Sequence, residues 1–255
     1  MSEHVKTEVA DRIQSVCINR PDKKNALTLA MYTALSDAVR GADQDPNIRV
    51  TLIAGSGDAF CSGNDIKDFL NNPITDESSP VIQFVNTMIG AKKPVVAAVN
   101  GIAVGIGVTM LLHCDLVYVA EGARLQMPFV NIGLCPEAGS TFLLPVLMGH
   151  RRAAELLLLG GPFDAARAVE LGIANAAVPA AQLQKTALEA ARRIASQPPD
   201  AVRVTKGLLR AALQNAVKAA SVREAEKFIP MLDGEEAKEA LNAFMEKRKP
   251  DFSRF

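Results

Sequence analysis

The chain has 255 residues, 49% of them hydrophobic, and its 28 Lys and Arg residues balance 28 Asp and Glu residues. This length fits one large domain, or one domain with a small appendage. The neutral balance gives no basic surface for nucleic acid or anionic lipid, and no apolar run reaches the roughly 18 residues of a membrane span. The four cysteines and three histidines lack the spacing of a disulfide framework or a metal site, so we expect a reducing compartment and no metal.

The N-terminal part of the sequence alternates strand and helix patterns. Residues 5–9 and 13–19 are apolar or alternating around a short polar turn and predict a β-hairpin. Residues 26–42 place apolar side chains four apart, which predicts a helix. The apolar run at 49–54 ends at glycines and predicts a strand, and residues 80–89 predict another helix.

Two continuous apolar runs in the centre, 94–99 and 114–119, are typical of strands buried on both faces. A glycine-rich stretch at 100–107 and a short predicted helix at 108–113 lie between them. Strand, glycine turn, helix and strand in this order predict an α/β fold with parallel pairing.

The C-terminal half is predicted to be mostly helical. We expect helices at 151–159, 164–171 and 181–196, and a short apolar run at 174–178. Two prolines then break the chain, and the residues that follow are rich in Ala, Leu, Lys, Arg and Glu. We therefore predict a core over residues 1–199 and a helical region over residues 200–255.

The segment Phe60-Cys-Ser-Gly-Asn-Asp-Ile66 follows a predicted strand and a tight glycine turn. Its small side chains and Gly63 let a ligand approach the backbone closely. Consecutive N–H groups in such a loop can face an anionic oxygen. The alternative is a simple loop closed by an Asx turn at Asn64 or Asp65.

A second glycine-rich segment, Gly101-Ile-Ala-Val-Gly-Ile-Gly107, lies between a predicted buried strand and a predicted helix. Its glycine spacing is not that of a dinucleotide-binding loop, and it lacks the Lys-Ser/Thr pair of a P-loop. What remains is a helix N-terminus with a free N–H near Ile106, which suits a developing oxyanion. The alternative is that these glycines serve only tight strand–helix packing.

One carboxylate, Glu137, stands between Pro136 and a small Ala-Gly-Ser-Thr run, ahead of the apolar residues 142–148. Pro136 suits the first turn of a helix, so we expect Glu137 at a helix N-terminus beside an apolar wall. The helix dipole favours the anion and apolar surroundings favour the neutral acid, a balance that suits a group that takes and returns a proton. The alternative is an ordinary first-turn glutamate.

Together these stretches resemble the crotonase, or enoyl-CoA hydratase/isomerase, superfamily along essentially the whole chain. The resemblance is carried by Asn19-Arg20-Pro21, Asn25-Ala26-Leu27, Ala59 to Ile66, Pro94 to Gly107, Cys114-Asp115, Gly133 to Thr141 and Phe244 to Lys249. It implies a ββα-spiral core with a helical C-terminal trimerisation region. It also implies a homotrimer, or a hexamer made of two trimers.

The resemblance further implies a site for an acyl-CoA thioester. The backbone N–H groups of Asn64 and Ile106 would polarise the thioester carbonyl and hold the enolate. The residues expected to bind CoA or substrate are Lys24, Ala26, Leu27, Ser62, Gly63, Asn64, Asp65, Ile66, Gly105, Phe129, Phe244 and Lys247.

Hydratases of this family use two glutamates to activate water, and both are replaced here. The matching positions hold Thr109 and Phe129, and an aromatic ring would also exclude water. Glu137 instead stands where a subset of the family carries its lone acid, and this subset resembles the peroxisomal type of Δ3,Δ2-enoyl-CoA isomerase. One carboxylate suffices to move a proton from C2 of a 3-enoyl-CoA to C4, without a cofactor or a metal.

Two alternatives stay open. One is another crotonase-type enzyme, either an enoyl-CoA hydratase or an isomerase of a ring-derived CoA ester in aromatic degradation. The other is a member that binds acyl-CoA or RNA without turnover, although the neutral charge disfavours RNA. We expect a cytoplasmic enzyme, with the peroxisome and the mitochondrial matrix as alternatives, because the C-terminal Ser253-Arg254-Phe255 is not the Ser-Lys-Leu address.

Overall fold

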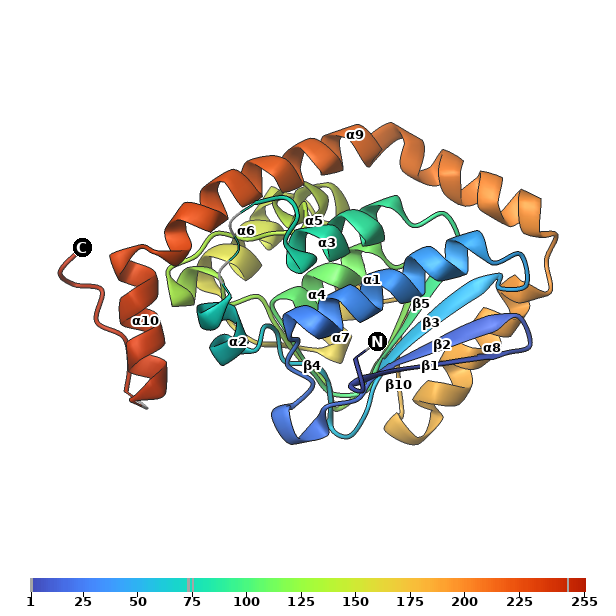
Figure 1. Cartoon of the computed structure of the whole chain (residues 1–255), viewed down its shortest axis with the longest axis horizontal. Coiled ribbons are helices and arrows are strands. Elements are labelled where there is room, and N and C mark those ends of the chain that lie inside the picture. Colours follow the sequence, from blue (N-terminus) through green and yellow to red (C-terminus); the bar gives the residue numbers. More distant parts are fainter. Residues whose placement is uncertain (1, 73, 75, 247) are drawn as a thin grey trace.

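The computed structural model describes residues 2–72, 74, 76–246 and 248–255, and within them a six-stranded sheet forms the centre of the fold (Figure 1). Its strands lie in the order β1 (Val5–Ala10), β2 (Ile13–Ile18), β3 (Val50–Gly55), β5 (Val95–Val99), β7 (Leu116–Ala120) and β10 (Ala176–Val178). β1 and β2 pair antiparallel, and the other neighbours pair parallel. The predicted hairpin and the predicted α/β class are confirmed.

Helices cover both faces of this sheet because its central strands are apolar on both sides. All five residues of β5 are buried. α1 (Leu29–Gln44) and α3 (Pro80–Gly90) pack on one another over one face, and α8 (Leu183–Ala195) covers the other (Figure 1). On the α8 side, Val50, Leu52 and Val96 pack with Ala187 and Ala191, whose small side chains let the helix lie close to the strands.

A second, smaller sheet includes parts of the two glycine-containing segments, so the glycine-rich stretch at 100–107, which we predicted as a turn, also contains a short strand. This sheet consists of β4 (Ala59–Cys61), β6 (Ile102–Val104), β8 (Arg124–Gln126) and β9 (Phe163–Asp164), in that order. Strands of two or three residues are too short to show a periodic apolar pattern. β4 and β6 pair in parallel, so the chain leaves both strands at the same edge.

The remaining described helices and 3₁₀ turns connect these layers. They are η1 (Pro21–Lys23), α2 (Ile66–Asn71), α4 (Ile106–Thr109), η2 (Met110–His113), η3 (Val130–Ile132), α5 (Ser140–Met148), α6 (His150–Leu159), α7 (Ala165–Glu170), η4 (Ala180–Gln182), α9 (Pro199–Leu232) and α10 (Glu235–Met245). The helices predicted in these regions are confirmed with small shifts of their ends. The predicted helix at 108–113 divides into α4 and η2.

The predicted start of the first helix at residue 26 is wrong. α1 begins at Leu29 and is capped by Thr28. Leu27 instead forms a parallel β-bridge with Asn64. The apolar spacing thus continues into a segment that pairs with the loop after β4, and a helical period does not reveal such a long-range contact.

The helical C-terminal region is confirmed, and α9 is its main element. In Figure 1 it arches over the helices that cover the sheet, and α10 follows at its far end. Val217 and Phe228 of α9 belong to the same buried cluster as α1, α3 and the sheet. The division between residues 1–199 and 200–255 stays a prediction.

A buried ion pair ties the first half of α9 to the sheet. The Lys206 Nζ lies 2.7 Å from Asp115 Oδ2, and the Val95 N–H donates to the same oxygen at 2.7 Å. Arg210 adds a second ion pair to Asp115 at 3.4 Å. Asp115, which directly precedes β7, therefore has a structural role.

Candidate active site

The two candidate N–H donors follow neighbouring strands. Asn64 comes after β4 and Ile106 comes after β6, and these strands pair in parallel. The two loops are in close contact, because a Cβ atom added at Gly107 would lie 2.3 Å from the Cys61 carbonyl oxygen. The structure therefore brings together the two loops that were predicted to present free backbone N–H groups.

Neither of these N–H groups is used elsewhere in the described part of the chain. Ile106 is the first residue of α4, and the first N–H groups of a helix have no intrahelical acceptor. The Asn64 N–H likewise donates to no other described residue. Gly63 has φ +100° and Gly105 has φ +56°, conformations that side chains of L-residues rarely adopt. Each free donor thus directly follows a glycine that the local turn requires.

Glu137 lies beside the second of these loops. The Thr109 hydroxyl, at the end of α4, donates a hydrogen bond to Glu137 Oε1. Desolvation by burial raises the pKa of Glu137 to about 8, the Thr109 bond acts in the opposite direction, and the nearby charge of Glu224 adds to the increase. Glu137 is nevertheless partly exposed. A carboxyl group with such a pKa can both take up and release a proton near neutral pH.

The prediction that Glu137 belongs to a helix N-terminus is wrong. α5 begins at Ser140, after Gly139. Ala138 has φ +62° and Gly139 has φ +72°, so the backbone leaves helical geometry directly after Glu137. The poorly solvated surroundings expected for this carboxyl group are present, but packing provides them and not the first turn of a helix.

Tyr32 is a buried neighbour of Asn64 whose role the sequence does not reveal. Its hydroxyl donates to the side-chain oxygen of Asn64 and so supports the loop after β4. Burial raises the pKa of Tyr32 well above its ordinary value, and the charges of Cys61 and Glu137 add to this. Burial also raises the pKa of Cys61 to about 12. Tyr32 belongs to the apolar stripe of α1, which is why its spacing indicates only a core position.

The predicted CoA-binding residues before α1 and after β4 are paired along their backbones. The Leu27 N–H donates to the Gly63 carbonyl at 2.8 Å, and the Asp65 N–H donates to the Leu27 carbonyl at 2.8 Å. The Ser62 N–H donates to the Lys24 carbonyl at 3.0 Å. Two segments that are distant in sequence thus form one continuous wall.

The side chain of Asp65 holds this wall in place. Its Oδ2 lies 2.6 Å from the Arg20 Nη1, and its Oδ1 accepts from the Asp68 N–H at 3.0 Å, which caps α2. The same Arg20 nitrogen donates to the Ala26 carbonyl at 3.1 Å. Ile66 stands at the start of α2 and is 36% exposed. Of this group, Ile66 presents the accessible apolar surface.

The other predicted binding residues to place are Phe129, Phe244 and Lys247. Phe129 is buried, with 5% of its surface exposed, and it directly precedes η3. The backbone at Phe244 belongs to α10, which packs against η3. Lys247 lies outside the described residues. Part of the tail therefore returns to the region of Phe129.

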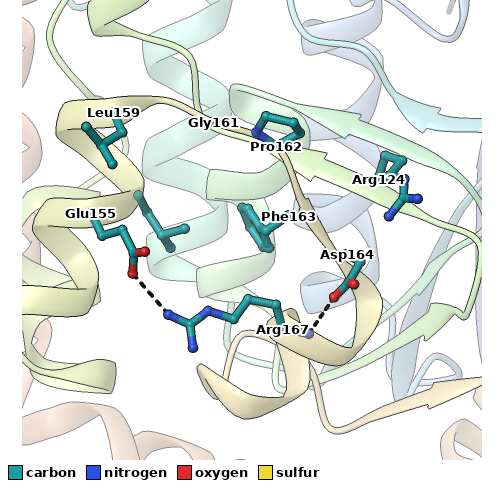
Figure 2. A pocket seen from close by; sticks show the side chains of 9 residues that line it. Arg124, Glu155, Leu159, Gly161, Pro162, Phe163, Asp164 and Arg167 are labelled. Atoms are coloured by element: carbon teal, nitrogen blue, oxygen red, sulfur yellow. Dashed lines mark hydrogen bonds and ion pairs between the residues drawn. The ribbon is translucent and has the colours of Figure 1, made fainter.

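A surface cavity of about 420 Å³ shares no lining residue with the groups above (Figure 2). It is lined by Arg124, Glu155, Leu156, Leu159, Gly161, Pro162, Phe163, Asp164 and Arg167. Figure 2 shows Arg167 directed towards Glu155, and their atoms lie 3.0 Å apart. Asp164 accepts from the Arg167 backbone N–H at 2.8 Å. Because Glu155 and Asp164 both bond to Arg167 and no predicted site residue lines this cavity, we place the candidate active site at Glu137.

In the part of the chain that the structure describes, no cluster of three His, Cys, Asp or Glu side chains is arranged to hold a metal ion. None of the described helices combines the length and apolar character needed to cross a membrane. The four cysteines are free thiols.

Known proteins are similar to this chain along almost its whole length. The family model for enoyl-CoA hydratase/isomerase matches residues 8–254. The 1,2-epoxyphenylacetyl-CoA isomerase of Escherichia coli (strain K12) is 33% identical over 262 residues, which cover 99% of each chain. The peroxisomal enoyl-CoA delta isomerase 3 of Mus musculus is 32% identical over 241 residues, which cover 92% of this chain and 76% of the mouse protein. Further relatives are named as hydratases.

A solved structure is also similar to this chain in both fold and sequence. The structure of Pseudomonas aeruginosa OdaA has a TM-score of 0.93 and 46% sequence identity, and the match covers 96% of this chain and 99% of that one. The predicted crotonase-like core with its helical C-terminal region is confirmed. The chain therefore belongs to the enoyl-CoA hydratase/isomerase family, which is the crotonase superfamily.

Proposed function

We propose that this enzyme is a Δ3,Δ2-enoyl-CoA isomerase, which converts a 3-enoyl-CoA to the trans-2-enoyl-CoA. Membership of the family supports an enzyme that acts on CoA esters as an isomerase or a hydratase. The observation that carries the finer proposal is the lone carboxyl group of Glu137, which has a pKa of about 8 and is bonded to Thr109. Thr109 ends the short helix α4, whose first residue, Ile106, has a free N–H.

In the proposed mechanism, ionised Glu137 removes a proton from C2 of the substrate. The electron pair moves onto the thioester oxygen, where the N–H groups of Asn64 and Ile106 stabilise the negative charge. One such donor contributes about 3 kcal/mol to transition-state stabilisation. Protonated Glu137 then delivers the proton to C4, and the double bond moves into conjugation with the carbonyl. Substrate and product have the same atoms and the same oxidation level, so the proposed reaction needs neither a cofactor nor a metal.

Two features disfavour hydration. Phe129, at the position of one hydratase glutamate, is a buried aromatic ring. Thr109, at the position of the other, is fully buried, and its hydroxyl is bonded to Glu137. Hydration requires a group that activates water in addition to one that protonates the enolate, and these two side chains do not supply it.

A second candidate is isomerisation of a ring-derived CoA ester. The name of the Escherichia coli relative, which matches this chain over almost its full length, supports this alternative. The same carboxyl group and the same pair of N–H groups would serve it. A protein that binds acyl-CoA without turnover is less well supported, because a carboxyl group with a pKa of about 8 is suited to proton transfer.

The test is a paired assay on one preparation of the protein. One arm supplies a 3-enoyl-CoA and follows formation of the conjugated 2-enoyl thioester, and the other supplies a 2-enoyl-CoA and follows its hydration. We expect rapid isomerisation and negligible hydration. Robust hydration would overturn the proposal, and the absence of both activities would favour the second candidate or the binding protein.

The pH dependence of the reaction should follow Glu137. The ionised carboxylate is the base, so kcat/KM is expected to rise with pH with a midpoint near 8. In a Thr109→Val variant the loss of the hydroxyl donor raises the pKa further, and the midpoint should move to higher pH. Rate profiles between pH 5 and 10 measure both. A flat profile, or a shift of the variant to lower pH, would contradict the role of Glu137.

We further propose that the enzyme is a homotrimer or a hexamer. Large apolar side chains on its surface support this: Leu208 and Leu209 of α9 are 71% and 77% exposed, and Leu158 and Leu159 of α6 are 70% and 68% exposed. Such side chains are often buried between subunits. The cytoplasmic location stays a prediction from the sequence.

A further inference from the structure

Glu224 is a buried carboxylate of α9 that reaches the loop of Glu137. Only 6% of Glu224 is exposed. Its Oε2 accepts from the Gly139 N–H at 2.5 Å. Its Oε1 accepts from the Thr141 N–H at 2.8 Å and from the Thr141 hydroxyl at 2.5 Å. Three donors thus converge on one carboxylate. Burial raises the pKa of Glu224, and the bonds from Thr141 and Gly139 oppose this by favouring the ionised form.

The loop that Glu224 holds has an unfavourable backbone conformation. Ala138 has φ +62°, a left-handed value that is unfavourable for a residue with a side chain. Such a conformation persists only where surrounding contacts hold it. One contact is His113, whose Nε2 lies 2.8 Å from the Ala138 carbonyl, and the other is Glu224. His113, which precedes the loop in sequence, and Glu224, which follows it, therefore both hold the backbone after Glu137.

This connection differs from an ordinary helix cap. Gly139, the cap residue of α5, has no side chain that could bond to the first turn. A local Ser, Thr or Asp would satisfy those N–H groups without involving another element. Here a residue 85 positions away supplies the acceptor, and α9 also packs directly on the loop. A Cβ atom at Gly139 would lie 3.0 Å from the Val217 Cγ1.

We propose that Glu224 is a positioning residue that sets the place and direction of the Glu137 carboxyl group by anchoring the backbone of Ala138 to Thr141 on α9. The inference rests on the proposed role of Glu137 as the proton carrier. α9 is a suitable anchor, because Lys206 and Arg210 bind Asp115 independently of this loop. The chemistry at Glu137 thus depends on correct docking of the C-terminal helix.

The charge of Glu224 should also be visible in the titration of Glu137. Glu224 raises the pKa of Glu137, after the larger effect of burial. The other charged or titratable groups that interact with this pair or its loop are Arg223 on α9, Cys135 before the loop, His113, Tyr32 and Cys61. Burial lowers the pKa of His113 to about 4, and burial raises the pKa of Cys135.

The experiment compares four variants of the full-length enzyme. Glu224→Gln removes the charge and places an amide nitrogen opposite one donor. Glu226→Gln makes the same chemical change at an exposed position of the same helix. Thr141→Val removes only the hydroxyl group that donates a hydrogen bond to Glu224. Glu137→Ala tests the proton carrier itself. Each variant is measured for kcat, KM and the pH midpoint of kcat/KM, and thermal unfolding shows whether it is folded.

We expect Glu224→Gln to lower kcat by about 10- to 100-fold with a much smaller change of KM, since a small displacement of a catalytic group has effects of this size. Its pH midpoint should fall, whereas loss of stability alone would leave the midpoint unchanged. Thr141→Val should lower kcat by about 5- to 10-fold, the factor that corresponds to one hydrogen bond. Glu226→Gln should match the wild type.

The outcomes separate this inference from the proposed function. If Glu137→Ala keeps its activity, the proposed function fails. If Glu137→Ala is inactive but Glu224→Gln matches Glu226→Gln in kcat and in pH midpoint, only the positioning role fails. If Glu224→Gln does not fold, Thr141→Val decides, and an unchanged kcat in that variant would overturn the inference.

Discussion

Replacing Glu137 with glutamine is expected to lower kcat for 3-enoyl-CoA isomerisation by about 10²- to 10⁴-fold, the contribution of a positioned general base. Glutamine keeps the size of the side chain and still accepts a hydrogen bond from Thr109, so KM should change little. Initial rates of formation of the conjugated thioester measure the effect. The exposed Glu226→Gln serves as the charge-matched control. A Glu137→Gln enzyme that keeps more than about a tenth of the wild-type rate would rule out the single-acid mechanism.

The same variant should also change the pH dependence of stability. The pKa of Glu137 is about 8 in the folded protein, compared with the ordinary 4.5 that applies when the chain is unfolded. Between these values the folded state holds a proton that the unfolded state has released, so the free energy of unfolding falls as the pH rises.

Glutamine does not titrate, so the free energy of unfolding of the Glu137→Gln variant does not fall with pH for this reason. At pH 8 the variant should therefore be more stable than the wild type by about 1–3 kcal/mol, because partial exposure screens part of the effect. At pH 4 the two should be nearly equal. Urea unfolding at the two pH values provides the comparison. Equal stability at pH 8 would mean that Glu137 is ionised in the folded enzyme without penalty.

Replacing Gly107 with alanine is expected to damage both stability and catalysis. The added Cβ atom would lie 2.3 Å from the Cys61 carbonyl oxygen, and a backbone atom of a paired strand cannot move away easily. Overpacking of this kind costs about 1–3 kcal/mol of folding free energy. The loops that present the N–H groups of Asn64 and Ile106 would separate, and loss of one oxyanion donor lowers kcat by about 10²- to 10³-fold.

A matched glycine is available as a control. Gly41 in α1 has no heavy atom within 4 Å of its added Cβ, and its backbone is helical. Gly41→Ala should therefore leave kcat unchanged and stabilise the protein by up to about 1 kcal/mol. Urea unfolding and steady-state rates on both variants complete the test. A Gly107→Ala enzyme that is destabilised but keeps its full kcat would show that the contact between the loops does not control the donors.

Features that depend on neighbouring residues could be predicted from the sequence. The continuous apolar run of β5 indicated a strand buried on both faces, and the alternation around Asp11 indicated the hairpin of β1 and β2. The free N–H of Ile106 followed from a glycine-rich turn before a helix. The proposed replacement of both hydratase glutamates, by Thr109 and Phe129, comes from the family resemblance and stays a prediction.

Features that depend on distant residues could not be predicted. The strands of the second sheet are too short to show a pattern, and they form because β4 and β6 meet in parallel. Glu137 leaves the predicted helix because the two residues after it take positive φ values, held there by contacts with His113 and Glu224.

The sequence by itself determined the α/β class and the family and predicted Glu137 as the lone carboxyl group of the site, because these depend on periodicity and on local motifs. The tertiary structure alone decided the state of that group. Its pKa of about 8 results from burial, from the hydroxyl of Thr109 and from the charge of Glu224, which lie 28 and 87 residues away. Desolvation and electrostatic interaction depend on distances in space, and separation along the chain does not reveal them.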